Sequence, residues 1–213
     1  LAVDKNQIVG LLGPNGAGKT TTFYAIAGIV KINRGKIVFK GNEIHNLPIH
    51  KRADHGLAYL PQEPSLFRDL TVIENLNGIC ELSKQPTLMT VDEIIHTFNL
   101  KKIINKKGRE LSGGQRRKTE IARTLIGDPK LLLLDEPFSG IDPIAVDEIK
   151  DLLSHIKTIG ISILITDHNV RETLNICDKS YLMADGSIFL SGTKEEIVSN
   201  SLAREKYLGS SFE

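Results

Sequence analysis

Apolar runs of four or five residues alternate with longer amphipathic segments along this chain of 213 residues. The run Ile8–Leu12 leads into a glycine-rich loop, a pattern typical of a buried parallel strand. Two further runs, 181–183 and 187–190, flank Asp185-Gly186, and this arrangement predicts a β-hairpin. Other strands are predicted at 36–39, 57–60, 131–134 and 161–165.

Helices are predicted where apolar positions recur at helical spacing without an internal proline. These segments are 19–27, 72–80, 91–99, 112–126 and 145–157. We expect Gly28 to end the first helix, and Ser112 to cap the fourth with Gln115 in the capping-box position. The pattern predicts a single α/β domain over 1–213, with a core at 1–62 and 128–213 and a helical subdomain at 63–127.

The amino-acid composition and net charge limit the classes of protein to which this chain can belong. Apolar residues make up 40% and charged residues 25% of the chain, so a folded domain is expected. The net charge of +1 argues against binding nucleic acid through general basicity. Cys80 and Cys177 are too few for a disulfide framework or a zinc site, and we expect reduced thiols in a cytosolic protein. No apolar run approaches the ~18 residues of a membrane span, so any membrane role is expected to come from partners.

The glycine-rich loop after the first strand has the pattern G-x-x-x-x-G-K-[ST]. Glycines let such a loop turn tightly, so that backbone N–H groups converge on phosphate oxygens. Lys19 can place its ammonium on the outer phosphates, the Thr20 hydroxyl can ligate Mg²⁺, and the helix that follows adds its positive dipole end. The predicted ATP-binding residues are Gly13, Pro14, Asn15, Gly16, Ala17, Gly18, Lys19, Thr20 and Thr21.

Two acids, Asp135 and Glu136, stand at the end of a predicted buried strand. Burying two carboxylates is costly unless a cation or a proton-transfer reaction uses them. Asp135 suits a second contact to Mg²⁺, usually through water, and Glu136 suits the general base that polarises an attacking water. The alternative is a strand end that merely reaches solvent.

Two more polar residues follow predicted strands. Gln62 can ligate Mg²⁺ or sense the γ-phosphate, and His168 can donate a hydrogen bond to the γ-phosphate, although each alone is more often structural. Phosphate-compatible groups at four strand ends are expected at the ligand edge of an open α/β sheet. The predicted catalytic residues are Glu136, His168 and Gln62, and the predicted metal ligands are Thr20, Gln62 and Asp135.

We assign no catalytic or ligand-binding role to the other histidines or to the basic run 116–118. Five histidines lie in polar surroundings without metal-ligand spacing, and we interpret them as surface residues: His45, His50, His55, His96 and His155. The run Arg116-Arg117-Lys118 resembles a nucleic-acid patch, but on a helix a solvated or partner-facing stretch is the better interpretation.

These motifs, in this order, resemble those of the nucleotide-binding subunits of ATP-binding cassette (ABC) transporters, and the resemblance covers the whole chain. They are the Walker A loop at 13–20, the Q-loop Gln62, the LSGGQ signature at 111–115, Walker B at 131–136, the D-loop at 139–142 and the switch His168. The resemblance implies the α/β P-loop NTPase fold of ABC ATPases, with a RecA-like core, an antiparallel β edge and a helical subdomain.

The family's mode of action follows from the same resemblance. Two subunits pack head to tail, with ATP and Mg²⁺ between the Walker A loop of one copy and the signature of the other. This implies a homodimer that hydrolyses ATP, peripheral on the cytoplasmic face of the inner membrane. It also implies transmembrane permease subunits whose coupling helices enter a groove of the helical subdomain. The residues expected to reach the partner's ATP are Leu111, Ser112, Gly113, Gly114, Gln115 and Asp142.

Within the family, several runs look like those of lipopolysaccharide export ATPases, which extract lipopolysaccharide from the inner membrane. These runs are 10–13, 59–63, 135–143, 165–173 and the closing 207–209. Branched-chain amino-acid importer ATPases are an alternative, but the run 167–172 favours the exporter.

A different class is a non-transport ABC ATPase that acts on nucleic acid. The stretch between Gln62 and Leu111 is too short for the long coiled coil of such proteins. Glu136 and His168 argue against a catalytically inactive cassette that serves only as a binding module. Because the chain opens at Leu1 without Met, we also expect a missing N-terminal segment, in which the family carries an aromatic residue that stacks on adenine. The antiparallel β edge and adenine binding would then be incomplete.

Overall fold

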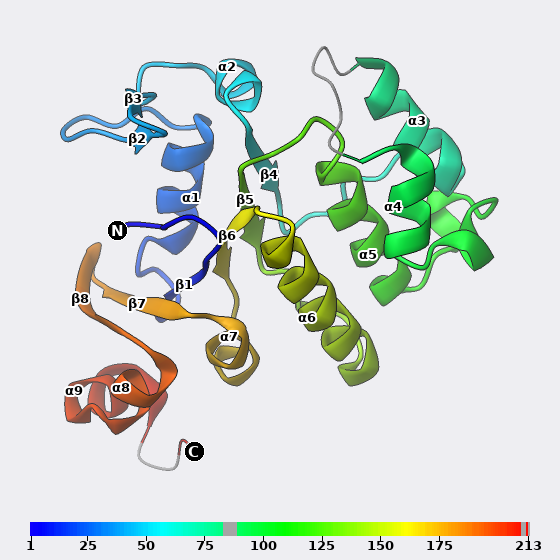
Figure 1. Ribbon diagram of the computed structural model, residues 1–213. Helices are drawn as coiled ribbons and strands as arrows, with labels where there is room; N and C mark the ends of the chain where they lie inside the picture. Colours follow the sequence, from blue (N-terminus) through cyan, green and yellow to red (C-terminus); the bar gives the residue numbers. More distant parts are fainter. Residues whose placement is uncertain (83–88, 210–211, 213) are drawn as a thin grey trace.

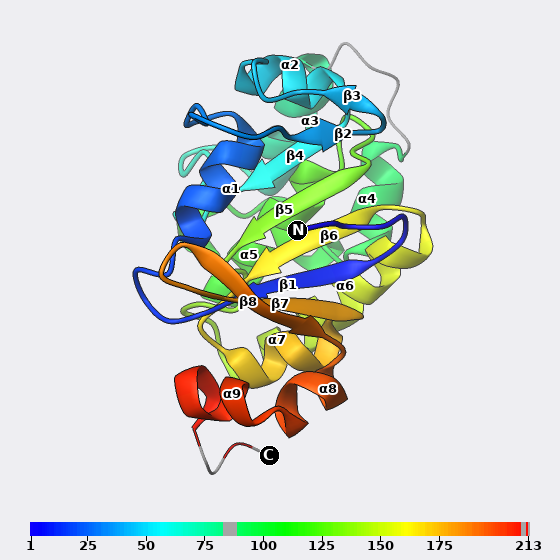
Figure 2. The same ribbon diagram turned by 90° about the vertical axis from the view of Figure 1, so that its left-hand side faces the viewer.

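The computed structural model describes residues 1–82, 89–209 and 212. A six-stranded sheet with the order β4-β5-β6-β1-β7-β8 forms its centre (Figures 1 and 2). All neighbouring strands run parallel except the β7–β8 hairpin, which is antiparallel. The strands are β1 (Ile8–Leu12), β4 (Leu57–Leu60), β5 (Leu131–Asp135), β6 (Ser162–Thr166), β7 (Lys179–Ala184) and β8 (Ser187–Gly192).

The central strands are buried on both faces, and this explains why their sequences are continuous apolar runs. All five residues of β1, of β5 and of β6 are buried. Leu132 and Leu134 pack with the cluster that includes α5 (Gly113–Thr124) and α6 (Pro143–Thr158), whereas Leu133 packs with the cluster that includes α1 (Lys19–Ala27). Figure 1 shows α1 on one side of the strands, and α5 and α6 on the other. Helices on both faces are the usual environment of a parallel sheet.

The remaining elements surround this core. The helices α3, α4 and α5 lie together to one side of the sheet (Figure 1), within the predicted helical subdomain. Residues 83–88 of that predicted subdomain, and 210, 211 and 213 of the predicted core, lie outside the described residues. The other elements are the antiparallel pair β2 (Val38–Phe39) and β3 (Asn42–Glu43), and the helices α2 (Ile49–Asp54), α3 (Val72–Leu82), α4 (Val91–Thr97), α7 (Val170–Ile176), α8 (Lys194–Ser199) and α9 (Ser201–Ala203). Three short helical turns complete the described part of the chain: η1 (Lys101–Ile103), η2 (Gly108–Glu110) and η3 (Arg204–Leu208).

The helix ends that the sequence signals locally are confirmed. Gly28 stops α1 with φ of 88°, a left-handed conformation that glycine adopts without strain, and its N–H donates to the carbonyl of Tyr24 over 3.0 Å. At the start of α5, Ser112 Oγ accepts from the Gln115 N–H over 3.2 Å, and Gln115 Oε1 accepts in return from the Ser112 N–H over 3.2 Å. The capping box is therefore present as predicted.

Other boundaries differ from the prediction for identifiable reasons. The helix predicted from residue 145 begins at Pro143, because Asp142 caps it: its Oδ1 accepts from the Ala145 N–H over 3.0 Å. The strand predicted at 36–39 is reduced to β2, which pairs only with the two-residue β3. Among the described residues, no helix is long and apolar enough to span a bilayer, and Cys80 and Cys177 are both free thiols.

Candidate functional site

The predicted catalytic residues come from the carboxyl ends of neighbouring parallel strands. In the sheet, β4, β5, β6 and β1 lie side by side in that order. Gln62 follows β4, Asp135 ends β5, His168 follows β6, and the glycine-rich loop follows β1. Because parallel strands end at the same edge, the four groups share one edge of the sheet, where open α/β folds bind ligands.

The predicted phosphate-binding loop, residues 13–21, is tightly packed where it leaves β1 and is exposed over residues 14–16. A Cβ atom on Gly13 would lie 2.1 Å from the carbonyl oxygen of Met183, so only glycine fits there. Gly18 adopts φ of 100° directly before α1 begins at Lys19. Gly13, Ala17 and Lys19 are buried and Gly18 is half-buried, whereas the other predicted loop positions are exposed: Pro14, Asn15, Gly16, Thr20 and Thr21.

Lys19 points back into its own loop. Its Nζ donates to the carbonyl oxygens of Gly13 over 2.7 Å and Pro14 over 3.0 Å, and the residue is buried. Burial lowers the pKa of the Lys19 ammonium, while the nearby charges of Glu136 and Asp135 raise it. The N–H donors of Lys19 that an anionic ligand would bind are therefore bonded to the loop carbonyls.

Asp135 and Glu136 are both buried, so the alternative of a strand end that merely reaches solvent does not apply. Burial raises the pKa of the Asp135 carboxyl, and Tyr59 opposes this by donating its hydroxyl to Oδ2 over 3.3 Å. Glu136 has φ of 48°, a left-handed conformation uncommon for a residue with a side chain. Its N–H donates to the carbonyl of Thr166 over 2.8 Å, which holds this turn against β6.

The Glu136 carboxylate contacts both of the other predicted catalytic residues, Gln62 and His168. Gln62 Nε2 donates to Oε2 over 2.6 Å, and His168 Nε2 lies 2.6 Å from Oε1. Burial raises the pKa of the Glu136 carboxyl, and the neighbouring His168 works in the opposite direction. Each carboxylate oxygen retains a lone pair. The group is thus positioned between two partners and still able to accept a proton.

Asp167 supports this arrangement and was not singled out from the sequence. It is buried between Thr166 and His168, and its Oδ2 accepts from the Phe138 N–H while Oδ1 accepts from the Asn169 N–H, each over 2.8 Å. These bonds tie the turn after Glu136 to the start of α7. Burial raises the pKa of the Asp167 carboxyl, and the two backbone bonds lower it. The available signal was an acid directly after a buried strand.

The signature residues form a second group, apart from the first. Leu111 and Gly114 are buried, and Ser112 and Gly113 are exposed at the start of α5. A Cβ on Gly114 would lie 2.5 Å from the Cβ of Ala145, so this end of α5 packs closely on the first turn of α6, which Asp142 caps. In the described part of the chain, no hydrogen bond links the signature to the phosphate-binding loop.

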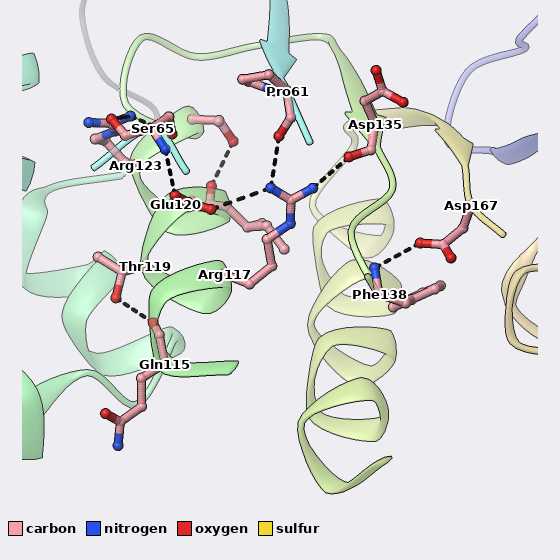
Figure 3. A network of polar contacts seen from close by, with 12 residues as sticks. Pro61, Ser65, Gln115, Arg117, Thr119, Glu120, Arg123, Asp135, Phe138 and Asp167 are labelled. Atoms are coloured by element: carbon pink, nitrogen blue, oxygen red, sulfur yellow. Dashed lines mark hydrogen bonds and ion pairs between the residues drawn. The ribbon is translucent and has the colours of Figure 1, made fainter. Parts of the chain in front are cut away.

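Arg117 corrects one interpretation of the sequence. The basic run 116–118 was expected to be solvated or to face a partner, but the Arg117 side chain is 7% exposed and lies inside the protein. Its Nη1 donates to the carbonyl of Pro61 over 2.9 Å and its Nη2 to the carbonyl of Asp135 over 2.7 Å (Figure 3). The helix that begins with the signature is therefore bonded to the ends of both β4 and β5.

Two more residues on the same face of α5 extend this connection. Glu120 pairs with Arg117 over 3.3 Å and accepts the Ser65 N–H over 2.7 Å, as Figure 3 shows. Arg123 Nη2 donates to the carbonyl and to the hydroxyl of Ser65, each over 2.8 Å. Because i, i+3 and i+6 positions share one face of a helix, these three side chains together fix the segment 61–65 that carries Gln62. That spacing was the signal available in the sequence.

Four of the five histidines interpreted as surface residues are exposed. His50, His55, His96 and His155 are exposed, and the His45 side chain is 20% exposed. Among the described residues, no group of three or more His, Cys, Asp and Glu side chains could hold a metal ion. A magnesium site at this edge would therefore combine Asp135 with hydroxyl, amide and phosphate oxygens, which is the usual pattern for that ion.

Comparisons with known proteins agree on one family. Residues 1–139 match the family model described as ABC transporter. The lipopolysaccharide export system ATP-binding protein LptB of Haemophilus influenzae is 50% identical over all of this chain and 90% of its own length, and that of Escherichia coli K12 is 45% identical with the same coverage. The solved structure of the ADP conformation of MJ1267, an ATP-binding cassette of an ABC transporter, superposes with a TM-score of 0.86 at 29% identity, covering 99% of this chain and 91% of that one.

Replacing Arg117 with Met should lower the free energy of unfolding by about 3 kcal/mol, because Glu120 would remain buried without its cation. Urea denaturation followed by circular dichroism measures this change. The matched control is Arg109→Met, which removes an exposed ion pair of 2.7 Å with Asp69. That pair should contribute at most about 1 kcal/mol. Equal effects of the two substitutions would contradict the role assigned to Arg117.

Proposed function

Because this chain belongs to the ABC transporter family and is an ATP-hydrolysing subunit of such a transporter, we propose that Glu136, His168 and Gln62 form its hydrolytic centre and that two copies work head to tail. The observation that carries this proposal is the Glu136 carboxylate held between Gln62 Nε2 and His168 Nε2, at the sheet edge that also bears the phosphate-binding loop.

The phosphate-binding loop, from Gly13 to Thr21, would hold the phosphates of ATP. Its backbone N–H groups and the start of α1 supply positive partial charge. The Lys19 ammonium would exchange the carbonyls of Gly13 and Pro14 for the outer phosphates, a short movement because it already lies inside the loop. A phosphate oxygen carries full charge and is the stronger acceptor.

Magnesium fits the donors at this edge. Thr20 is exposed beside the loop, and Asp135, at the end of β5, has one hydrogen-bonded partner for its carboxylate among the described residues, the Tyr59 hydroxyl. Asp135 thus retains lone pairs for a cation or for its water, and Gln62 can add an amide oxygen. The bound ion would neutralise charge on the outer phosphates.

Glu136 would accept the proton of the attacking water. Its burial, which raises the pKa, makes it a better base than an exposed carboxylate. His168 is half-exposed and can turn its ring N–H toward the γ-phosphate, and Gln62 can orient the water. Each of these movements frees one oxygen of Glu136.

The exposed signature supports the head-to-tail dimer. Ser112 and Gly113 stand at the start of the 12-residue helix α5, where backbone N–H groups lack intrahelical partners. Such a helix end suits a phosphate. A second copy would bring its γ-phosphate there, in contact with the residues predicted from the sequence: Leu111, Ser112, Gly113, Gly114, Gln115 and Asp142.

A groove on the helical side offers a place for the membrane subunits. It has a volume of about 590 Å³ and lies between α2, β4, α3 and the end of α5. Ile49, Ile79 and Leu82 give it an apolar lining. We propose that residues 63–127 act as a helical subdomain and that coupling helices of transmembrane permease subunits enter this groove. The chain would then work at the cytoplasmic face of the inner membrane.

Lipopolysaccharide is the transported substrate that we propose. Support comes from two relatives named as lipopolysaccharide export system ATP-binding proteins, 50% and 45% identical over the whole chain. The substrate would be handled by the permease subunits, while this chain supplies the free energy of ATP hydrolysis.

Lys19→Ala should weaken MgATP binding by about 10- to 100-fold, because it removes a charged donor to the outer phosphates. Calorimetric titration of ATP into the purified chain measures the affinity. Lys36→Ala, at an exposed position, is the control and should bind as the wild type does. An unchanged dissociation constant for Lys19→Ala would overturn the assignment of the loop.

Glu136→Gln should convert the chain into an ATP-bound dimer on size exclusion, because the amide preserves the shape of the site but cannot accept a proton. Adding Ser112→Arg to this variant should restore the monomer while ATP binding to the loop persists, since the added side chain blocks the partner's phosphate. A Glu136→Gln chain that holds ATP yet stays monomeric would refute the head-to-tail arrangement.

Membrane proteins that co-purify with the tagged chain from its own cells should include the permease subunits of a lipopolysaccharide export system. Mass spectrometry identifies them, and Lys19→Ala provides a matched sample in which the groove is unaltered. Capture of a branched-chain amino-acid permease instead would replace the proposed substrate and leave the ATPase assignment intact.

A further inference from the structure

Arg52 in α2 is a fully buried arginine that the proposed hydrolytic cycle does not use. It is 2% exposed, the largest of the fully buried side chains. All of its bonds among the described residues go to backbone carbonyls, and none goes to a carboxylate. Its Nε donates to Leu47 over 2.8 Å and its Nη2 to His45 over 2.9 Å, while Nη1 donates to Ala25 over 2.6 Å and to Ile26 over 2.7 Å.

Two of these carbonyls belong to the last turn of α1. The final carbonyls of a helix have no intrahelical N–H to accept, and they lie at the negative end of the helix dipole. The Tyr24 carbonyl accepts the N–H groups that follow the helix, including that of Gly28, and the Arg52 guanidinium serves Ala25 and Ile26. A Cβ on Gly28 would lie 2.7 Å from Arg52 Nε, so the glycine leaves room for the guanidinium.

The opposite end of α1 is the phosphate-binding loop. The helix has nine residues, which corresponds to about 13 Å at 1.5 Å per residue. A helix of this length moves as a rigid body, so fixing its carboxyl end restrains Lys19 at its amino end. In the described part of the chain, every hydrogen bond between α2 and α1 comes from Arg52.

The other side of α2 faces the proposed partner groove. Arg52 points away from the groove toward α1. The other residues of α2 line the groove: Ile49, His50, Lys51, Ala53 and Asp54. Figure 1 shows α2 near one end of α1, and the last turn of α3 contributes Ile79 and Leu82 to the groove. The guanidinium thus connects an element that lines the groove to the carboxyl end of α1.

We propose that Arg52 is a positioning residue for ATP binding, which fastens α2 to the carboxyl end of α1 and so links the occupant of the groove to the phosphate-binding loop. The second half of this statement rests on the proposed function, in which a permease subunit fills the groove. The first half concerns the isolated chain alone. This route is separate from the one through Arg117, which joins α5 to Gln62 and Asp135.

The expected kinetic signature distinguishes positioning from simple support of the fold. Arg52→Gln and Arg52→Lys loosen the phosphate cradle but leave Glu136, Gln62 and His168 on their own strands. They should raise the KM for ATP by about 5- to 10-fold with kcat within about twofold, the pattern of lost uniform binding. A merely structural arginine would reduce the folded fraction, and hence the maximal rate and Tm, at unchanged KM.

The test measures steady-state ATP hydrolysis by the purified full chain, with the melting temperature of each variant recorded. Arg34→Gln, at an exposed arginine, is the control and should match the wild type. Should both Arg52 variants fail to fold, Arg52→Met, which keeps an apolar side chain in the buried position, is measured in the same assay. An unchanged KM in the folded variants would overturn the proposal.

The link to the groove is tested in the complex with the co-purified permease subunits. Arg52→Lys should still assemble, but the ratio of its hydrolysis rate in the complex to that of the free chain should fall toward one. An unchanged ratio would overturn the link. If the wild type assembles with no permease, the proposed function fails, and the KM measurement still decides the role of Arg52.

Discussion

The parallel alignment of β4, β5, β6 and β1 is the constraint on which the rest of this molecule depends. Their shared direction brings four carboxyl ends to one edge, although the residues they carry are separated by up to about 150 positions in the chain. Apolar burial on both faces holds the strands in register. The hydrophobic effect thus assembles the polar groups at the edge, and the edge in turn determines where chemistry is possible.

Buried arginines connect the surrounding helices to that edge. Arg117 bonds the signature helix to the carbonyls that follow β4 and end β5, and Arg52 bonds α2 to the end of the helix behind the phosphate-binding loop. Both guanidiniums donate to backbone carbonyls, which cannot titrate, and Arg117 also pairs with the Glu120 carboxylate. The planar group with five donors in a fixed geometry can bridge two or three chain segments at once. The helices therefore cannot shift without disturbing the groups that they hold.

Local signals made much of the fold and site predictable. The cap at Ser112, the stop at Gly28 and the phosphate-binding pattern each involve residues within a few positions of one another, so one sequence reveals them. Arg117 was misjudged because its partners Pro61 and Asp135 lie 56 and 18 positions away, and a basic run on a helix is usually solvated. Arg52 was overlooked for the same reason, since its burial depends on how α2 meets α1. Residue type and spacing locate the helix end whose carbonyls lack donors, but not the distant side chain that will reach them.

The charges at the site are balanced internally, and this shapes how ATP must be received. Lys19 is bonded to the carbonyls of its own loop, and Glu136 is bonded to Gln62 and His168. Neither buried charge is left exposed to an apolar surrounding, which would cost several kcal/mol. In the proposed mechanism, each internal bond would be exchanged for one to nucleotide, water or metal before hydrolysis. Exchanging one hydrogen bond for another changes the free energy little, so under this proposal the positions of α1 and of the segment that carries Gln62 would influence the exchange. Arg52 bonds to α1, and Arg117 bonds to the segment that carries Gln62. Through these contacts, the proposal gives α2 and α5 an influence on the site.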